Sequence, residues 1–600
     1  MFDTYRKLLD LLTPREKGRF YILLVLILFM GFFEMVGVAS IVPFMVVLSD
    51  PGIIQRHSVL QSVYNGLGFT DPNNFMIFLG FGVFAIVVIG TAFRTVVQYA
   101  VFRFSTMRSD SISSRMLEGY LFQPYTWFLN RHSGDLSANI LGDVGQVVNR
   151  SLRPAMSLLT YAVVVLALVG LLIFVRPEAA FASAVLLGGS YLLIYVSVQK
   201  YLHRLGQERK IANDLRFQIV GEAIGGIKDV KLLGLEKRFL QRFHKPSRRL
   251  AEAEAMSSII GEVPRYILEA VAFGGMLAFV LFLLIRGDGS LASVIPVLAI
   301  YAFAGVRIFP ALQKIYNSVT LIRFSKPTLD KLHEDMIEAQ ANMRQRPELD
   351  KTASVPLNST LELVDIHYAY PKAERTALQG LSLEIPARST IGIVGGTGAG
   401  KTTAVDIVLG LLIPDQGKLL VDGLEITETN RHAWQRSIGY VPQQIFLTDA
   451  SIASNIAFGR RPDEIDMEAV EHASRIAELH KFVMDEMPQG YETKVGERGV
   501  RLSGGQRQRI GIARALYHDP DVLILDEATS ALDNLTERAV MDAVHNLGHA
   551  KTIIMIAHRL TTVRDCDTIF MLEQGRVVAA GSYTELFENN RQFRTLAGGA

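Results

Sequence analysis

Six long hydrophobic runs constrain what this chain of 600 residues can fold into more than any other feature. A helix needs about 20 predominantly apolar residues to cross the hydrocarbon core of a bilayer, and each run is near or above that length. The 49% hydrophobic content is likewise too apolar for a wholly soluble chain. We therefore predict an α-helical six-span membrane domain, with spans at Phe20–Leu48, Phe75–Tyr99, Ala155–Val175, Ala179–Val198, Ile267–Ile285 and Leu291–Phe309.

Basic residues are spread unevenly over the connections between these runs. Lys and Arg crowd the connection 199–264, whereas the connections after the first, third and fifth runs hold Arg56, Arg176 and Arg286. The positive-inside rule therefore places both termini and the long connections 102–154 and 199–264 in the cytoplasm. The sequence predicts a multi-pass protein of the cytoplasmic (inner) membrane.

The two long connections keep a helical pattern with few breakers, so we expect the membrane helices to extend well into the cytoplasm. The pattern is interrupted near the midpoint of each connection, at 124–128 and at 226–230. A short transverse helix at each interruption would rest on another domain. The alternative is an ordinary helical hairpin with an exposed tip.

Flanking segments complete the predicted membrane part. Residues 1–12 read as an amphipathic helix that lies on the membrane surface. Apolar residues at helical spacing between residues 50 and 74 favour either a small helix on the outer membrane face or a packed connector. The predicted boundaries are 1–19 for the N-terminal helix, 20–325 for the spans and their extensions, 326–359 for a further helix and a polar linker, and 360–600 for a soluble domain.

The soluble part contains a phosphate-binding loop that fits GxxxxGK[ST]. A strand-like run, 390–394, leads directly into a glycine-rich segment that precedes a helical pattern. Glycines let backbone N–H groups turn toward phosphates, Lys401 reaches the β- and γ-phosphates, and the Thr402 hydroxyl binds Mg²⁺. The sequence predicts an α/β P-loop ATPase domain with ATP bound at Gly395, Gly396, Thr397, Gly398, Ala399, Gly400, Lys401, Thr402 and Thr403.

Two acidic residues, Asp526 and Glu527, follow a buried-strand pattern at 522–525. They would emerge at the carboxyl end of a strand beside the nucleotide. We predict that Asp526 holds Mg²⁺ and that Glu527 polarises the attacking water. The alternative is a pair of capping or salt-bridging carboxylates.

Four segments together resemble the ATP-binding cassette (ABC) family over about residues 360–600. They are Leu502-Ser503-Gly504-Gly505-Gln506, Asp526-Glu527, Ser530-Ala531-Leu532-Asp533 and His558. The resemblance implies a nucleotide-binding domain with an α-helical subdomain. The segment 496–499 is similar to the loop that ABC exporters place next to their coupling helices.

The same resemblance implies roles for single residues. Tyr370 would stack on adenine, Gln443 would link the Mg²⁺ and the water to the membrane domain, and His558 would contact the γ-phosphate. For Tyr370, a surface aromatic is the alternative. The resemblance assigns catalysis to Glu527, His558 and Gln443, and metal binding to Thr402, Gln443 and Asp526.

The family resemblance also implies a partner. In ABC proteins, ATP is sandwiched between the phosphate loop of one subunit and the LSGGQ segment of the other. In this chain that second half would be Ser503, Gly504, Gly505, Gln506 and Asp533. Because one copy of each half-site is present, we predict a dimer that ATP closes and hydrolysis reopens. Since Glu527, His558 and the LSGGQ segment are all present, we expect a homodimer, with an obligatory heterodimer as the alternative.

Charged residues inside apolar runs are costly in a bilayer and point to function. Glu34, Arg94 and Arg307 lie within runs, and Arg265 lies at the start of one. At ~1.5 Å per residue, Arg94 lies about 28 Å below Phe75 and Arg307 about 24 Å below the outer end of the sixth run. We predict that Arg94, Arg265 and Arg307 meet and clamp a diphosphate or another anion. Snorkelling to the lipid headgroups, or an internal ion pair with Glu34, is the alternative.

The membrane part, over roughly residues 1–345, resembles the exporter fold shared by drug, lipid and peptide transporters. Segments 31–35, 41–44 and 307–310 and the outer helical loop are similar to bacterial lipid-linked oligosaccharide flippases of the PglK type. This resemblance implies that the chain uses ATP to translocate a polyprenyl-diphosphate-linked glycan. It also implies that Arg94, Arg265 and Arg307 bind the diphosphate.

Composition limits the other classes of function that the chain could have. The 61 basic and 59 acidic residues give a formal net charge of +2, so no nucleic-acid partner is implied. Cys566 is the single cysteine, which leaves neither an intramolecular disulfide nor a cysteine metal cluster. An exporter of another lipid, a drug or a peptide remains open, as does an ATP-gated channel or regulator. The intact Glu527 favours turnover over gating alone.

Overall fold

The computed structural model describes residues 2–131, 133–175, 177–286, 291–344, 354–371, 373, 375–527, 540–543, 550–557 and 559–598. The chain divides into two compact units. We call Met1–Gln123 with Arg131–Gln345 the helical unit, and Pro124–Asn130 with Arg346–Ala600 the sheet unit.

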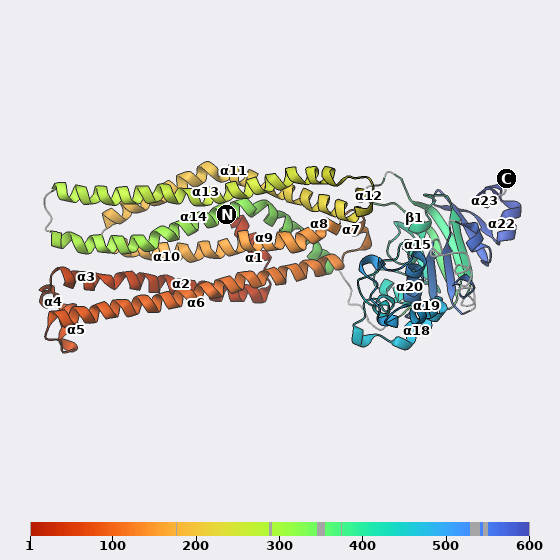
Figure 1. Ribbon diagram of the computed structural model, residues 1–600, viewed down its shortest axis with the longest axis horizontal. Helices are drawn as coiled ribbons and strands as arrows, with labels where there is room; N and C mark the ends of the chain where they lie inside the picture. Colours follow the sequence, from red (N-terminus) through yellow and green to blue (C-terminus); the bar gives the residue numbers. More distant parts are fainter. Residues whose placement is uncertain are drawn as a thin grey trace. The chain divides into compact units, whose positions relative to one another are not determined.

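Long helices that run alongside one another build the helical unit (Figure 1). All helices of this unit, long and short, are in chain order α1 Phe2–Asp10, α2 Pro14–Ala39, α3 Ile41–Ser49, α4 Ile53–Arg56, α5 Ser58–Gly66, α6 Pro72–Leu121, α8 Ser133–Ser137, α9 Val144–Val147, α10 Arg153–Val175, α11 Pro177–Gly225, α12 Ile227–Leu232, α13 Glu236–Arg286 and α14 Leu291–Arg344. Two π-helical turns, η1 Ala138–Asp143 and η2 Val148–Leu152, flank α9.

Within the described residues, three helices are long and apolar enough to cross a membrane: Pro14–Ser49, Pro72–Leu121 and Gly134–Phe174. They contain the first two predicted spans and all but the last residue of the third. The other three predicted spans lie inside α11, α13 and α14. The helical nature of all six runs is confirmed, while the count of six membrane crossings stays a prediction.

Four helices far exceed the thickness of a bilayer. α6, α11, α13 and α14 have 50, 49, 51 and 54 residues. At ~1.5 Å per residue each is roughly 75 Å long, against about 30 Å of hydrocarbon core. The prediction that the helices continue well beyond the apolar runs is confirmed.

Local signals in the sequence set where the first membrane helix begins and breaks. Thr13 caps α2 through a reciprocal capping box with Glu16, and Pro14 occupies the first helical position. The run predicted as one span, Phe20–Leu48, is two helices that meet at Ser40. The Ser40 hydroxyl donates to the Gly37 carbonyl at 2.8 Å.

The N-terminal helix is shorter than predicted. It ends at Asp10, and α2 starts at Pro14, so the predicted segment 1–19 is wrong as a single helix. Leu8 of α1 is buried, and Lys7 Nζ lies 2.7 Å from Asp330 Oδ1 of α14. Tyr5 Oη donates to the Ala155 carbonyl at 3.1 Å. The helix therefore packs on the bundle through part of its surface.

The loop between the first two spans folds into α4 and α5. Its residues pack with Val47 of α3 and Phe75 of α6 around the buried Ile54. The expected small helix is present as two short helices, and the packed-connector interpretation describes its contacts.

Short helices occur at both predicted interruptions of the long connections. α12 spans 227–232, and α7 spans Tyr125–Leu129. The flanking helices α11 and α13 pack against each other, as do α10 and α14. Close approach of α11 to α14 depends on Gly206, where an added Cβ would lie 2.0 Å from the Phe324 carbonyl oxygen.

The sheet unit combines two sheets with helices. Its strands are β1 Thr360–Tyr368, β2 Leu378–Pro386, β3 Thr390–Gly395, β4 Gln416–Val421, β5 Leu424–Glu425, β6 Ile438–Val441, β7 Val522–Asp526, β8 Thr552–Ile556, β9 Thr568–Glu573 and β10 Arg576–Gly581. Its helices besides α7 are α15 Lys401–Val408, α16 Arg431–Gln435, α17 Ile452–Ile456, α18 Met467–Ile476, α19 His480–Glu486, α20 Gly504–Leu516, α22 Tyr583–Asn589 and α23 Arg591–Leu596, with 3-10 turns η3 Pro462–Glu464, η4 Gly490–Glu492, η5 Glu497–Gly499 and η6 Leu560–Val563.

The order of the strands brings the predicted nucleotide residues to one sheet edge. Among described residues, one sheet has the order β10-β9-β3-β8-β7-β6, and its strands are parallel except for β10. An antiparallel sheet, β2-β1-β4-β5, forms the second layer. The carboxyl ends of β3 and β7, with β8 between them, carry the phosphate loop and the acidic pair.

The sheet unit begins before the predicted boundary at residue 360. Leu357 is buried in the core that holds β1, and Val355 packs against it. The Val355 N–H donates to the Ala433 carbonyl at 3.2 Å, and the Asp422 carboxylate accepts from the N–H groups of Ser359 and Thr360. These contacts extend the domain back through a segment predicted as linker.

Candidate nucleotide site and charged membrane cluster

The phosphate loop has the backbone that its glycines predict. β3 ends at Gly395, and α15 begins at Lys401. Gly398 and Gly400 have φ of +80° and +100°, a region that strains other residues. A Cβ at Gly400 would lie 2.8 Å from Leu378 Cδ2, so this position has no room for a side chain.

The Lys401 side chain folds back onto the start of the phosphate loop. Its Nζ donates to the carbonyls of Gly395 at 2.8 Å and Gly396 at 3.1 Å. Burial lowers the pKa of Lys401, and the nearby charges of Glu527 and Asp526 oppose that shift. The Lys401 ammonium group is held by neutral carbonyl oxygens, which a phosphate can replace as a stronger, charged acceptor. The backbone N–H groups of the loop can donate to the same phosphate.

The acidic pair lies at the end of β7, beside β6. Gln443, which follows β6, donates from Nε2 to Glu527 Oε2 at 2.7 Å. Tyr440 Oη approaches Asp526 Oδ2 at 3.4 Å, and Gln508 Nε2 donates to the Glu527 carbonyl at 3.3 Å. The parallel register of β6 with β7 therefore brings together Gln443 and Glu527, which are far apart in sequence.

The residues proposed for a metal fit Mg²⁺. Thr402, Asp526 and Gln443 offer hydroxyl, carboxylate and amide oxygens, the hard ligands that this ion prefers. Thr402 lies in the first turn of α15, and Asp526, at the end of β7, is close enough for its charge to raise the pKa of Lys401.

One acidic residue near this site was missed in the sequence. Burial raises the pKa of Asp406 from 3.8 to about 6, and the charge of Asp526 adds to the shift. Asp406 lies on α15 among buried apolar residues. A single carboxylate inside a helical pattern gives no sequence signal of its burial.

Tyr370 lies over the start of α15. Its hydroxyl is 3.1 Å from Thr403 Oγ1, and its ring meets that of Tyr368 edge to face at 5.2 Å. α7 belongs to the same compact unit, where Pro124 and Thr126 line a cavity together with Tyr368 and Asp415. A transverse segment of the long connections thus lies beside the strand that leads to Tyr370.

The LSGGQ segment forms the N-terminus of α20. Ser503 is the capping residue: its Oγ accepts from the Gln506 N–H at 3.2 Å, and its N–H donates to Gln506 Oε1 at 2.7 Å. Gly504 and Gly505 begin the helix without side chains. This leaves a helix N-terminus that an anionic group can approach. Asp533 and His558 lie outside the described residues.

The charged residues of the membrane helices form a cluster around Glu34. Arg94 Nη1 lies 3.3 Å from Glu34 Oε1, and Arg307 Nη1 lies 3.0 Å from Glu34 Oε2. The Glu34 side chain is 6% exposed, against 37% for Arg94 and 28% for Arg307. The carboxylate is therefore buried beneath two more accessible guanidinium groups.

Arg265 does not share this cluster in the structure. Its Nε lies 2.7 Å from Glu269 Oε1, one turn along α13. The structure therefore brings Arg94 and Arg307 together, while Arg265 pairs with Glu269 of its own helix, and a site shared by all three arginines stays a prediction. The internal ion pair with Glu34, considered as an alternative, is present for Arg94 and Arg307.

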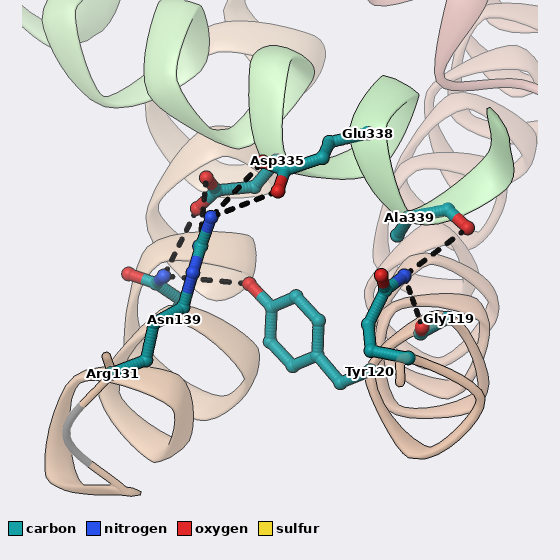
Figure 2. A network of polar contacts seen from close by, with 8 residues as sticks. Gly119, Tyr120, Arg131, Asn139, Asp335, Glu338 and Ala339 are labelled. Atoms are coloured by element: carbon teal, nitrogen blue, oxygen red, sulfur yellow. Dashed lines mark hydrogen bonds and ion pairs between the residues drawn. The ribbon is translucent and has the colours of Figure 1, made fainter. Parts of the chain in front are cut away.

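A second polar network, shown in Figure 2, had no sequence signal. Asn139 Nδ2 donates to Asp335 Oδ2 at 3.1 Å and to Tyr120 Oη at 3.4 Å. Arg131 Nη2 donates to both carboxylate oxygens of Glu338 at 3.0 Å. Burial raises the pKa of Asp335, and Lys331 and Arg131 oppose that shift.

The network holds both flanks of α7 to α14. Gln123, two residues before α7, donates to the carbonyls of Gly119 at 2.9 Å and of Ala339 at 3.5 Å. Arg131, two residues after the end of α7, pairs with Glu338. Helix periodicity predicts each helix but says nothing about which polar residues of distant helices meet.

A P-loop ATPase site joined to a bundle of long apolar helices defines a membrane transporter driven by ATP. A family model described as "ABC transporter" matches residues 378–530, and one described as "ABC transporter transmembrane region" matches residues 7–306. The ATP-dependent lipid A-core flippase of Saccharophagus degradans is 32% identical over 481 residues, which are 79% of this chain and 79% of that protein.

Two further comparisons agree. The heterocyst differentiation ATP-binding protein HepA of Nostoc sp. is 34% identical over 367 residues, 61% of this chain but 59% of that protein. The solved structure of a bacterial Atm1-family ABC exporter with ATP bound matches with a TM-score of 0.76 at 23% sequence identity. The match covers 97% of this chain and 98% of the exporter chain, so the two chains share a fold. The chain belongs to the ABC transporter family. It is an exporter-type half-transporter, with a helical membrane domain fused to an ATPase domain whose activity is coupled to transport.

Proposed function

We propose that this exporter translocates a lipid-linked oligosaccharide, or a related polyprenyl-diphosphate glycolipid, across the inner membrane by alternating access. The observation that carries the proposal is the convergence of Arg94 and Arg307 on one carboxylate among apolar helices. Two adjacent guanidinium groups match a diphosphate, which offers oxygens to both. A drug exporter with an apolar cavity has no use for such a pair.

The similarity to ATP-dependent lipid A-core flippases supports a lipid cargo. Arg265 keeps its place in the proposal as a third ligand for the diphosphate. Its pair with Glu269 is solvent-exposed and lies within one helix, so it contributes little stability and an arriving anion can replace it.

Hydrolysis in this proposal uses the residues at the ends of β3 and β7. The loop N–H groups and Lys401 bind the β- and γ-phosphates, and Glu527 polarises the attacking water. Gln443 orients Glu527 through their 2.7 Å hydrogen bond. Thr402, Asp526 and Gln443 would hold Mg²⁺, which would supply positive charge beside the phosphates. Tyr370 stacks on adenine, and His558 contacts the γ-phosphate.

A second copy of the chain completes each site. Ser503, Gly504, Gly505, Gln506 and Asp533 of one protomer close over the phosphate loop of its partner, and the α20 N-terminus supplies N–H groups. Closure and reopening switch the membrane cavity between its two faces. Both termini and the ATPase domains lie in the cytoplasm, as the basic connections favour.

The test is ATP hydrolysis by the purified protein in vesicles, with and without a polyprenyl-diphosphate-linked oligosaccharide. We expect the lipid to stimulate turnover of the wild type several-fold. Arg307→Ala should lose that stimulation and keep basal hydrolysis, because the lost group touches cargo and not ATP. Glu527→Gln should lose hydrolysis by about 100-fold or more.

The matched control is Arg204→Ala, which removes another helical arginine paired with a carboxylate, Glu208, on the exposed surface of α11. It should respond to the lipid as the wild type does. If the lipid changes the hydrolysis rate of no variant, Arg94 and Arg307 have a structural role and the exporter carries a different cargo.

A further inference from the structure

The charge balance of the membrane cluster departs from that of a simple anion site. A site built only to bind a diphosphate would leave its two guanidinium groups for the ligand. Here Glu34 Oε1 accepts from Arg94 at 3.3 Å and from Arg307 at 3.2 Å, and the second carboxylate oxygen lies 3.0 Å from Arg307. The Glu34 carboxylate thus accepts hydrogen bonds from the same guanidinium groups that a diphosphate would bind.

The geometry of the three side chains also separates their roles. They come from three helices, α2, α6 and α14, and Glu34 is the most buried of them. The arginines keep accessible surface, so an anion can reach them without passing the carboxylate. A buried carboxylate stripped of its partners is strongly disfavoured. A head group that binds the two arginines must therefore displace Glu34 at a cost in free energy.

We propose that Glu34 is a resident counter-ion that competes with the anionic head group for Arg94 and Arg307, and so limits cargo affinity and drives release. This inference rests on the proposed function, because it takes the diphosphate as the ligand of the two arginines. When the head group leaves, Glu34 takes back both guanidinium groups, and the apolar helices never enclose two unpaired cations. An exporter that must release what it binds gains from such a competitor.

The substitution Glu34→Gln separates this role from that of a simple support. Glutamine has the same shape but no charge, so the two arginines lose their competitor. If Glu34 competes, the variant binds the diphosphate more tightly, by about tenfold or more. If Glu34 only positions the arginines, the same variant binds it more weakly.

Glu34→Asp tests the same idea while keeping the charge. Its shorter side chain reaches the two guanidinium groups less well, so binding should tighten by a smaller factor than in Glu34→Gln. This variant leaves no unbalanced charge among the helices and keeps the test open if the glutamine variant folds poorly. The control is Glu208→Gln, which frees Arg204 on the exposed surface and should bind lipid as the wild type does.

The readout is binding, measured apart from hydrolysis. The full-length protein is reconstituted in vesicles of zwitterionic lipid and titrated with polyprenyl diphosphate, and the half-saturating concentration is read from the rise in its unfolding temperature. A lower half-saturating concentration for Glu34→Gln, and a smaller decrease for Glu34→Asp, supports the proposal.

Two other results have distinct meanings. Unchanged or weaker binding in both Glu34 variants, with the wild type binding normally, overturns the competitor role and leaves the proposed function intact. No saturable binding by the wild type removes the proposed function, and the competitor role with it.

Discussion

Single residues of the ATP site take their chemistry from burial and from strand order. The phosphate loop and the acidic pair were predicted from the sequence because each is a contiguous pattern with a fixed place on a strand. The 2.7 Å contact between Gln443 and Glu527 depends on the register of β6 with β7, which the sequence did not predict. The raised pKa of Asp406 was not predictable, because it depends on what packs over α15.

Asp406 gives a stability prediction with a defined pH dependence. Its pKa is raised from 3.8 to about 6 in the folded protein, so the stability linked to its protonation is present below pH 3.8 and lost as pH rises through about 6. At neutral pH, Asp406→Asn should stabilise the protein by up to about 3 kcal/mol, because it removes a buried charge.

Thermal unfolding of the full chain in buffer without nucleotide or Mg²⁺ measures this effect from about pH 5 to about pH 8. The advantage of Asp406→Asn over the wild type should grow as pH rises. Asp463→Asn, at an exposed pair with Arg461, is the control and should show no such trend. A constant difference at every pH would contradict the burial argument.

At the scale of elements, hydrophobic periodicity predicted the long helices, and its interruptions indicated where the short helices α7 and α12 occur. It did not predict the break at Ser40, the π-helical turns around α9 or the early start of the sheet unit near Val355. These depend on tertiary contacts that a local pattern does not contain. The contacts of Gln123 and Arg131 with α14 also depend on tertiary packing.

The contact between α6 and α14 gives a prediction at this scale. A Cβ at Gly119 would lie 2.7 Å from Ala339 Cβ, so Gly119→Ala forces the two helices apart beside the network in Figure 2. We expect a loss of stability of about 1–3 kcal/mol, read as a lower unfolding temperature. Cargo-stimulated hydrolysis should fall more than basal hydrolysis, since the flanks of α7 lose their register on α14.

Gly221→Ala on α11 is the matched control. No atom lies within 4 Å of the added Cβ, so the helix should gain up to about 1 kcal/mol from the better helix former. Equal effects of the two substitutions would mean that the α6–α14 approach has no special role.

At the scale of the whole molecule, the sequence predicted a membrane domain fused to an ATPase domain, and the family matches confirm that class. The homodimer remains a prediction, and two inactive variants test it. Lys401→Ala removes the phosphate ligand from one half-site, and Ser503→Arg blocks the other. Pure dimers of either variant should be inactive. Mixed dimers carry one intact site and should recover up to about half of the wild-type hydrolysis.

Co-expressed chains with different affinity tags, purified through both tags in turn, isolate the mixed dimer. Hydrolysis no higher than that of the pure variants would contradict sites shared between two copies. Full activity of pure Ser503→Arg would remove the LSGGQ segment from the site.

The most direct measurement of the central claim is translocation itself. Vesicles containing the protein and a polyprenyl-diphosphate-linked oligosaccharide receive ATP, and a glycan-cleaving enzyme outside the vesicles reports how much lipid remains accessible. We expect ATP-dependent movement by the wild type, none by Glu527→Gln, little by Arg307→Ala, and normal movement by Arg204→Ala. Movement that is equally fast with and without Arg307, or that proceeds when Glu527→Gln has stopped hydrolysis, would contradict this expectation.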